Sequence, residues 1–204
     1  MSIPLFHNRP VTLLGAALAC CALVACKPKG EQPADTATAA IAPAADTAAT
    51  AAPAKPNDAQ IAHIAVTANS IDSAAGVLAK SKAQSKAVKD FAQTMITDHT
   101  QVNKQAVALA TKLGVTPEDN DVSQQLNSGA QTSQESLKAK SGADFDSAYM
   151  DHEVTFHQAV LDALDSTLIP DAQNAELKDL LTKVRPAIAA HLERAKSIRA
   201  SLGA

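Results

Sequence analysis

Residues 86–114 read KAVKDFAQTMITDHTQVNKQAVALATKLG, and this stretch decides the fold class. Apolar side chains return every three or four residues, which is the spacing of one face of an α-helix. Gly114 then ends the pattern, since glycine is favoured just beyond the last turn of a helix. The apolar stripe consists of Val88, Phe91, Met95, His99, Val102, Ala106, Leu109 and Leu113. The stretch predicts a long amphipathic helix with a histidine on its apolar face.

Three further stretches show the same spacing, and none shows the alternation of a half-buried strand. The first follows Asn57, the second follows Gly142 and ends at Pro170, and the third reaches Leu202. Their stripes are Ile61, Ile64, Ala68, Ile71, Ala75 and Leu78; Met150, Glu153, His157, Val160, Leu161, Leu164 and Leu168; and Leu177, Leu181, Val184, Ile188, His191, Ala195, Ile198 and Leu202. Four such helices bury their stripes most simply against one another, so we predict an all-α bundle.

The connections between these helices predict the topology. Residues 83–85 join the first two helices and residues 169–171 join the last two, whereas residues 115–141 separate the second from the third. Two hairpins joined by one long crossover form a ferritin-like four-helix bundle, and the crossover is expected to hold a short extra helix near residues 121–139. The alternative is an up-down-up-down bundle with a helical insertion.

Pro186 falls inside the last predicted helix. Proline is favoured in the first turn of a helix, so we predict that a new helical segment begins there. The alternative is a kink that opens the bundle beside His191.

The amino-terminal segment resembles a bacterial lipoprotein signal. Arg9 precedes an apolar run that starts at Val11 and is too short to span a bilayer. The run closes with Leu23-Val24-Ala25-Cys26, which is similar to a lipobox, whose cysteine is acylated and becomes the first mature residue. We therefore predict a signal peptide over residues 1–25 and a membrane anchor through lipid on Cys26. The alternative is an ordinary secretory signal that is cut nearby.

Residues 26–56 are rich in proline, alanine and threonine and hold one large aliphatic side chain, Ile41. Such a segment cannot bury enough apolar surface to offset its chain entropy, so it is predicted to be a disordered tether before a folded domain over residues 57–204. Lys27 stands where aspartate retains many lipoproteins in the inner membrane. This favours an outer-membrane lipoprotein that faces the periplasm.

The composition excludes several classes of function. The chain has 18 Lys and Arg against 21 Asp and Glu, with the signs interspersed, so no basic patch for nucleic acid is present. Cys20 and Cys21 lie in the predicted signal, which leaves no thiol for disulfides or metal ligation once Cys26 carries lipid. Isolated glycines form no phosphate-binding loop, and no Gly-x-Ser-x-Gly elbow presents a nucleophile. We therefore predict no enzymatic activity, and no protein partner is indicated.

Histidines occupy the predicted apolar seam of three helices, at His99, His157 and His191. Glu153 lies one turn before His157 on the same face, and Asp72 lies at the edge of the first helix's stripe. Burying such groups without partners costs about 1 to 3 kcal/mol each. The favoured interpretation is a hydrogen-bonded polar cluster, or packing at different heights along the bundle. The alternative is a single divalent transition metal, since imidazole and carboxylate suit zinc, copper, iron or nickel.

A di-iron centre is the least favoured interpretation. Di-iron bundles draw a Glu from each of two helices and a Glu-x-x-His pair from each of the other two. The residues three positions before the seam histidines are Ile96, Val154 and Ile188, and none is acidic. Asp98 is the neighbour of His99, but adjacent side chains on a helix point about 100° apart, so the two are not expected to face one target.

Several motifs resemble those of a bacterial exported family. They are residues 88–99 (VKDFAQTMITDH) followed by Asn103, residues 144–150 (DFDSAYM), His157, and Pro186 followed by His191-Leu192. On these motifs the chain is similar, over residues 58–202, to the domain-of-unknown-function family numbered 4142. The resemblance implies a ferritin-like helical fold and an outer-membrane location. It also implies that the seam histidines are positions of the family's motifs. Ala74 departs from the family pattern, because members commonly carry Glu there, and this weakens a carboxylate-rich metal site.

The predicted function is therefore that of a lipid-anchored envelope protein whose bundle serves as a non-catalytic envelope or interaction module. The alternative is a metal-binding or redox-protective bundle that uses its core histidines.

Overall fold

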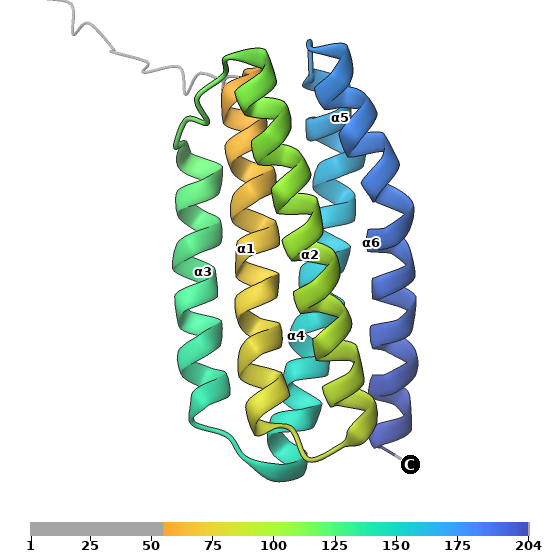
Figure 1. Ribbon diagram of the computed structural model, residues 1–204. Helices are drawn as coiled ribbons and strands as arrows, with labels where there is room; N and C mark the ends of the chain where they lie inside the picture. Colours follow the sequence, from red (N-terminus) through yellow and green to blue (C-terminus); the bar gives the residue numbers. More distant parts are fainter. Residues whose placement is uncertain (1–54, 204) are drawn as a thin grey trace, which may run out of the picture. The chain divides into compact units, whose positions relative to one another are not determined.

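The computed structural model describes residues 55–203, and most of these residues lie in helices. The helices are α1 (Asp58–Lys82), α2 (Lys86–Leu113), α3 (Asp121–Lys138), α4 (Gly142–Ala163), α5 (Ile169–Asp171) and α6 (Ala175–Leu202), and a π-helical turn, η1 (Leu164–Leu168), joins α4 to α5. They stand side by side as a bundle (Figure 1). The predicted all-α class is confirmed. The predicted signal peptide, the lipid site Cys26 and nearly all of the predicted tether lie outside the described residues.

Side-chain caps and one glycine set the helix ends. The Asn57 side chain accepts a hydrogen bond from the backbone of Gln60, and the Gln60 side chain accepts one from the backbone of Asn57, so the two close the start of α1 as a capping box. Asn120 and Ser123 do the same for α3. Gly114 ends α2 with a φ of 65°, a conformation that few other residues adopt without strain. The sequence predicted this end correctly.

The helices pair as the short connections predicted. α1 packs along α2, and α4 packs along α6. α2 and α4 run in the same direction, and the chain returns between them through α3, which lies alongside α1 (Figure 1). α3 has 18 residues, so the extra helix that was predicted to be short is a long fifth helix. Its pattern is weak because only Ser123 and Leu137 of this helix are buried.

Two prolines behave differently from the prediction. The third predicted helix continues through Pro170 to Asp171 by way of η1 and α5. Pro186 lies inside an unbroken α6, so the prediction of a new helical segment at this position is wrong. Proline removes the hydrogen bond to the carbonyl of Thr182, but both residues are exposed, so water can solvate that carbonyl.

α1 lies inside the bundle and packs against three other helices, α2, α3 and α4. By length and composition alone α1 is apolar enough to cross a membrane. Half of its most apolar window is buried inside the bundle, however, and the core helix of a bundle passes the same test. Its composition is thus explained by its central place.

The core consists of two apolar clusters with a polar layer between them. Asp72 lies between the two clusters on α1, Glu153 and His157 lie between them on α4, and His99 lies at the border on α2. The cluster near the α1–α2 turn contains Ala75, Ala79, Ala83, Val88, Phe91, Ala92, Met95, Leu137, Phe145, Tyr149, Met150, Ala195 and Ile198. The cluster near the start of α6 contains Ile61, Ile64, Leu161, Leu164, Leu168, Ala172, Leu177, Leu181, Ile188 and Leu192.

The approach of α1 to α2 at Gly76 gives a test of this packing. A Cβ atom at Gly76 would lie 2.9 Å from the carbonyl oxygen of Ala92 and 3.1 Å from Ile96 Cγ1. We expect Gly76→Ala to lower the free energy of unfolding by about 1 to 3 kcal/mol, because the two helices must move apart. Urea unfolding followed by circular dichroism measures the change.

Gly129→Ala on α3 is the matched control, since nothing lies within 4 Å of a Cβ atom there. It should raise the free energy of unfolding by up to about 1 kcal/mol, because alanine favours the helix. A Gly76→Ala variant as stable as this control would contradict the close approach of α1 and α2.

Candidate metal centre

The structure brings all five predicted site residues together in the polar layer. Asp72 comes from α1, His99 from α2, Glu153 and His157 from α4, and His191 from α6. All five residues are buried, and none is more than 8% exposed. The centroids of the three imidazole rings lie 5.3, 5.5 and 5.7 Å apart. The histidines therefore lie at one height, and the interpretation that separated them along the bundle is wrong.

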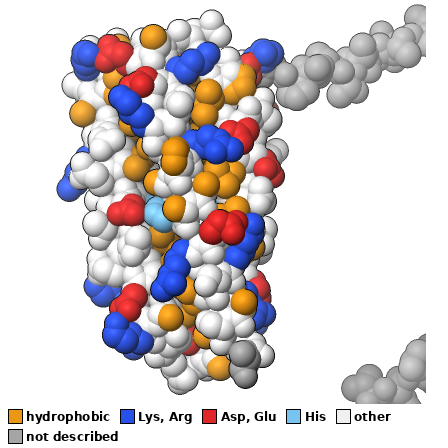
Figure 2. All heavy atoms as spheres, turned by 90° about the vertical axis from the view of Figure 1, so that its right-hand side faces the viewer, with side chains coloured by type: hydrophobic (Ala, Val, Ile, Leu, Met, Phe, Trp, Pro, Cys, Tyr) orange, Lys and Arg blue, Asp and Glu red, His pale blue; other side chains and the backbone are white. Residues whose placement is uncertain are grey.

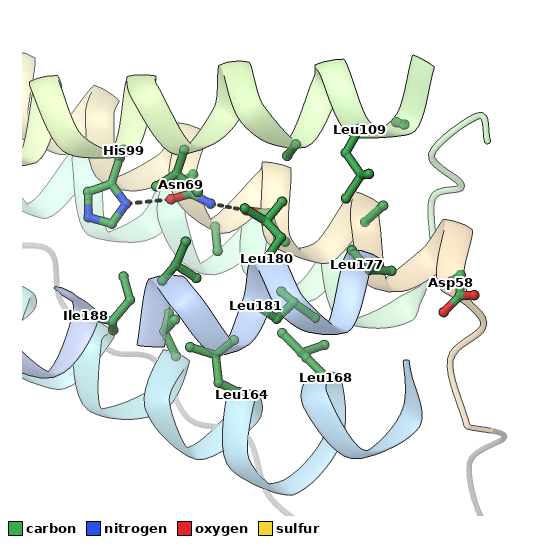
Figure 3. Close-up of a pocket in the computed structure, with 18 of the residues that line it drawn as sticks. Asp58, Asn69, His99, Leu109, Leu164, Leu168, Leu177, Leu180, Leu181 and Ile188 are labelled. Carbon is green, nitrogen blue, oxygen red and sulfur yellow. Dashed lines mark hydrogen bonds between the residues drawn. The ribbon is translucent and has the colours of Figure 1, made fainter. Parts of the chain in front are cut away.

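His99 is oriented by an amide. Its Nδ1 lies 2.6 Å from Asn69 Oδ1 (Figure 3). Asn69 Nδ2 donates to the carbonyl of Ala65 at 2.7 Å, which turns the amide oxygen towards the ring, so His99 Nδ1 carries the proton. Burial, with His157 and His191 nearby, lowers the pKa of His99 to about 3. The ring is neutral near pH 7, and its Nε2 keeps a free lone pair.

The other two imidazoles follow the same arrangement. His157 Nδ1 donates to the backbone carbonyl of Glu153 at 3.0 Å, and His191 Nε2 donates to Asp98 Oδ2 at 3.0 Å. The opposite nitrogens, His157 Nε2 and His191 Nδ1, are buried and have no hydrogen-bond partner within residues 55–203, and the same holds for His99 Nε2. Each histidine is therefore fixed through one nitrogen and leaves the other available.

Asp72 lies against two of these nitrogens. Its Oδ2 is 3.1 Å from His99 Nε2 and 3.3 Å from His157 Nε2. Neither contact has the angle of a hydrogen bond, and both carboxyl oxygens of Asp72 lack a partner in the described part of the chain. Burial, and next the charge of Glu153, raise the pKa of Asp72 well above its usual range. Burial also raises the pKa of Glu153 to about 8, so Glu153 holds a proton near pH 7.

Buried nitrogen and oxygen lone pairs that converge without hydrogen bonds fit a cation. Two groups have ligand atoms within 4.8 Å of one another: His99, His157 and His191, and Asp72, Glu153 and His157. Histidines that bind metals usually donate their second N–H to a carboxylate, a backbone carbonyl or water. Two of these histidines donate in that way and His99 donates to an amide oxygen. These residues could therefore hold a metal ion.

Sequence reasoning missed two residues that orient the histidines. Asn69 carries an uncharged side chain at the edge of the α1 stripe, and only its spacing of three residues from Asp72 could have suggested it. Asp98 does not contact its neighbour His99. It reaches across to His191 on α6 instead, because adjacent side chains on a helix diverge. The buried hydroxyl of Tyr149 has no hydrogen-bond partner in residues 55–203.

Fold and site together define an all-helical protein with a buried cluster of histidines and carboxyls. The family model described as domain of unknown function (DUF4142) matches residues 42–198. Because this match covers more than half of the chain, the protein belongs to that family, as the sequence motifs predicted. Neither the curated proteins nor the solved structures give a match.

The buried carboxyls predict how stability depends on pH in the metal-free protein. The pKa of Glu153 is raised from 4.5 to about 8, so in this range the folded state keeps a proton that the unfolded state has released, and stability falls as pH rises. The pKa of His99 is lowered from 6.5 to about 3, so its effect is confined to pH values below 6.5 and has the opposite sign.

Between pH 6.5 and 8 we therefore expect Glu153 to lower the free energy of unfolding by up to about 1.4 kcal/mol per pH unit. Urea unfolding at several pH values in this range measures the slope. Glu153→Gln should remove much of it, because glutamine cannot bind that proton. Glu135→Gln on the exposed face of α3 is the control and should keep the slope. An unchanged slope in Glu153→Gln would contradict the raised pKa.

Proposed function

We propose that this protein holds a single divalent transition metal at the centre of a ferritin-like bundle. His99 Nε2, His157 Nε2 and His191 Nδ1 would supply three nitrogen ligands. The observation that supports this proposal is that each imidazole is fixed through one nitrogen and buries the other without a partner in the described residues. A hydrogen-bonded cluster, the interpretation favoured from the sequence, would need a donor for the lone pair of each of these three nitrogens. A metal ion would accept all three lone pairs, so the metal-binding alternative accounts for more of the geometry.

Asp72 would be the fourth ligand. Its Oδ2 lies within 3.3 Å of two of the nitrogens, and its own oxygens need a positive partner when ionised. A metal would bind the ionised carboxylate of Asp72, whose pKa is raised by burial, so binding should become tighter as pH rises. Glu153 belongs to the second group of possible ligands and could neutralise the remaining charge. Three imidazoles and a carboxylate suit zinc, copper, iron or nickel.

The surroundings favour retention of an ion over exchange. Apolar side chains lie on both sides of the cluster, and none of the ligand residues is more than 8% exposed. A site closed in this way suits storage, protection or stabilisation of the fold. We therefore keep the prediction of a non-catalytic protein, with metal binding as its activity.

Metal analysis of the purified mature protein tests this proposal. We expect one equivalent of zinc, copper, iron or nickel per chain, and its loss in His157→Ala, because a ligand is removed. Asn69→Ala should weaken binding by about 10- to 100-fold, because it releases the ring of His99. Isothermal titration calorimetry with elemental analysis measures both.

The control for the ligand variant is His63→Ala, since His63 lies on α1 outside the two groups of ligand residues. This variant should bind metal as the native protein does. A native protein that stays free of metal after incubation with zinc, iron and copper would refute the proposed function. Equal losses in His63→Ala and His157→Ala would refute the assignment of the site.

We propose further that lipid on Cys26 anchors this domain to the outer membrane, facing the periplasm. The support is the stretch Leu23-Val24-Ala25-Cys26 and the lysine that follows it. Cys26→Ser should abolish labelling of the protein with radioactive palmitate in growing bacteria, because the acylated thiol is lost. Cys21→Ser, five residues earlier in the predicted signal, should keep the label. Palmitate incorporation into Cys26→Ser would show that the anchor is elsewhere.

A further inference from the structure

A narrow apolar cavity runs from the polar layer towards the start of α1. Its volume is about 100 Å³. Asn69, Asp72 and His99 line its inner end, and Asp58 and Asn174 line its outer end. Between them lie aliphatic side chains of both hairpins, among them the leucines labelled in Figure 3. The cavity therefore joins the proposed metal centre to one end of the bundle.

The dimensions of this cavity indicate its shape. Asp58 and Asp72 both line it, and on an α-helix they lie about 21 Å apart at 1.5 Å per residue. One water needs about 10 to 15 Å³ of such volume, so about 100 Å³ corresponds to roughly seven to ten water-sized spheres. Spread evenly over this length, they would lie in single file, one about every 2 to 3 Å. A cavity of this width fits a chain of methylene groups better than a ring.

The lining determines which chemistry the cavity would accept. No Lys or Arg is among the lining residues, so a carboxylate or phosphate head would find no counter-charge there. Asp58 at the outer end would repel an anion, and its oxygens already accept hydrogen bonds from the backbone of Gln173 and Asn174 at 2.8 and 2.9 Å. An occupant should therefore be uncharged.

The seam between α2 and α6 provides a route into the cavity. Several lining residues on these helices are only half-buried: Val102, Leu109, Leu113, Leu180 and Val184. Apolar side chains reach the surface between charged ones on the face of the bundle that carries α6 (Figure 2). Lys112 of α2 and Glu176 of α6 form an exposed ion pair across this seam. Such a pair is weak in water, so it can open to admit a chain.

We propose that this cavity binds an unbranched, uncharged aliphatic chain, of the kind found in long-chain alcohols. Filling it restores contacts that the apolar lining otherwise lacks. The chain would lie with one end beside Asp72, His99 and His157. The position of this end next to a bound metal rests on the proposed metal centre. The cavity and its lining do not depend on any metal.

Two alcohols with the same number of carbon atoms test the shape. 1-Decanol is linear, whereas 1-adamantanol is a compact cage. In the metal-free protein we expect 1-decanol to shift the methyl resonances of the lining leucines in a saturable way, and 1-adamantanol to leave them unchanged. Absence of saturable decanol binding, or equal binding of the two alcohols, would overturn the proposal.

Filling the cavity tests its location. Ala106→Leu places a larger side chain among the lining residues, and we expect it to weaken decanol binding by about tenfold or more, because little volume remains. Ala108→Leu on the exposed face of α2 is the matched control and should bind decanol normally. Ala68→Leu fills the cavity from α1, so it replaces the first variant if Ala106→Leu does not fold. Normal binding in a folded filling variant would place decanol elsewhere.

An experiment with added Cu²⁺ tests this proposal independently of the proposed metal centre. With Cu²⁺ bound, the protons at one end of the decanol chain should relax faster than in the metal-free protein. Decanol binding to a protein that retains no zinc, iron or copper would remove the metal proposal alone. Retained copper without decanol binding would remove the cavity proposal alone. Retained copper and bound decanol without faster relaxation would overturn the placement of the chain beside the cluster.

Discussion

Burial of ionisable side chains at one height in an otherwise apolar core is the constraint on which the rest of this structure depends. Each of four helices contributes to the layer, and α4 supplies both Glu153 and His157. Sliding one helix by a turn would move its polar group into an apolar cluster and leave partners in the layer unsatisfied. The layer therefore fixes the register of the four helices, while the cap at Asn57 sets the start of α1 and the turn at Gly114 sets the end of α2.

The charge of this layer would differ with and without a bound cation. Without metal, burial favours the protonated forms of Asp72 and Glu153, because it disfavours ionised carboxyls. With the proposed cation, the ion would satisfy both the ionised carboxyls and the lone pairs of the neutral imidazoles. The hydrogen bonds made by Asn69 and Asp98 would be compatible with such an ion, since they hold the ring nitrogens that face away from the cluster. The histidines are thus oriented before any ion binds.

The two halves of the bundle are packed differently on either side of this layer. Phe91, Phe145 and Tyr149 fill the half near the α1–α2 turn. The other half is built mainly from aliphatic side chains, with Phe156 of α4 and alanines of α1 and α2 facing the cavity that remains. The small number of aromatic residues in the chain therefore has a structural consequence. Three of them fill one half of the core, and the smaller side chains in the other half leave a gap.

The sequence by itself determined the four amphipathic helices, the turn at Gly114, the two hairpins and family membership, because these depend on periodicity and on local backbone chemistry. It also named the five site residues, since a polar side chain on an apolar stripe is visible in the pattern. Only the tertiary structure decided that α3 is a long fifth helix, that α6 passes through Pro186, and that the histidines meet. Heights along a bundle depend on how helices slide against one another, and no local pattern encodes that. The contacts of Asn69 and Asp98 follow from the same register, which is why they emerge only when the helices are packed.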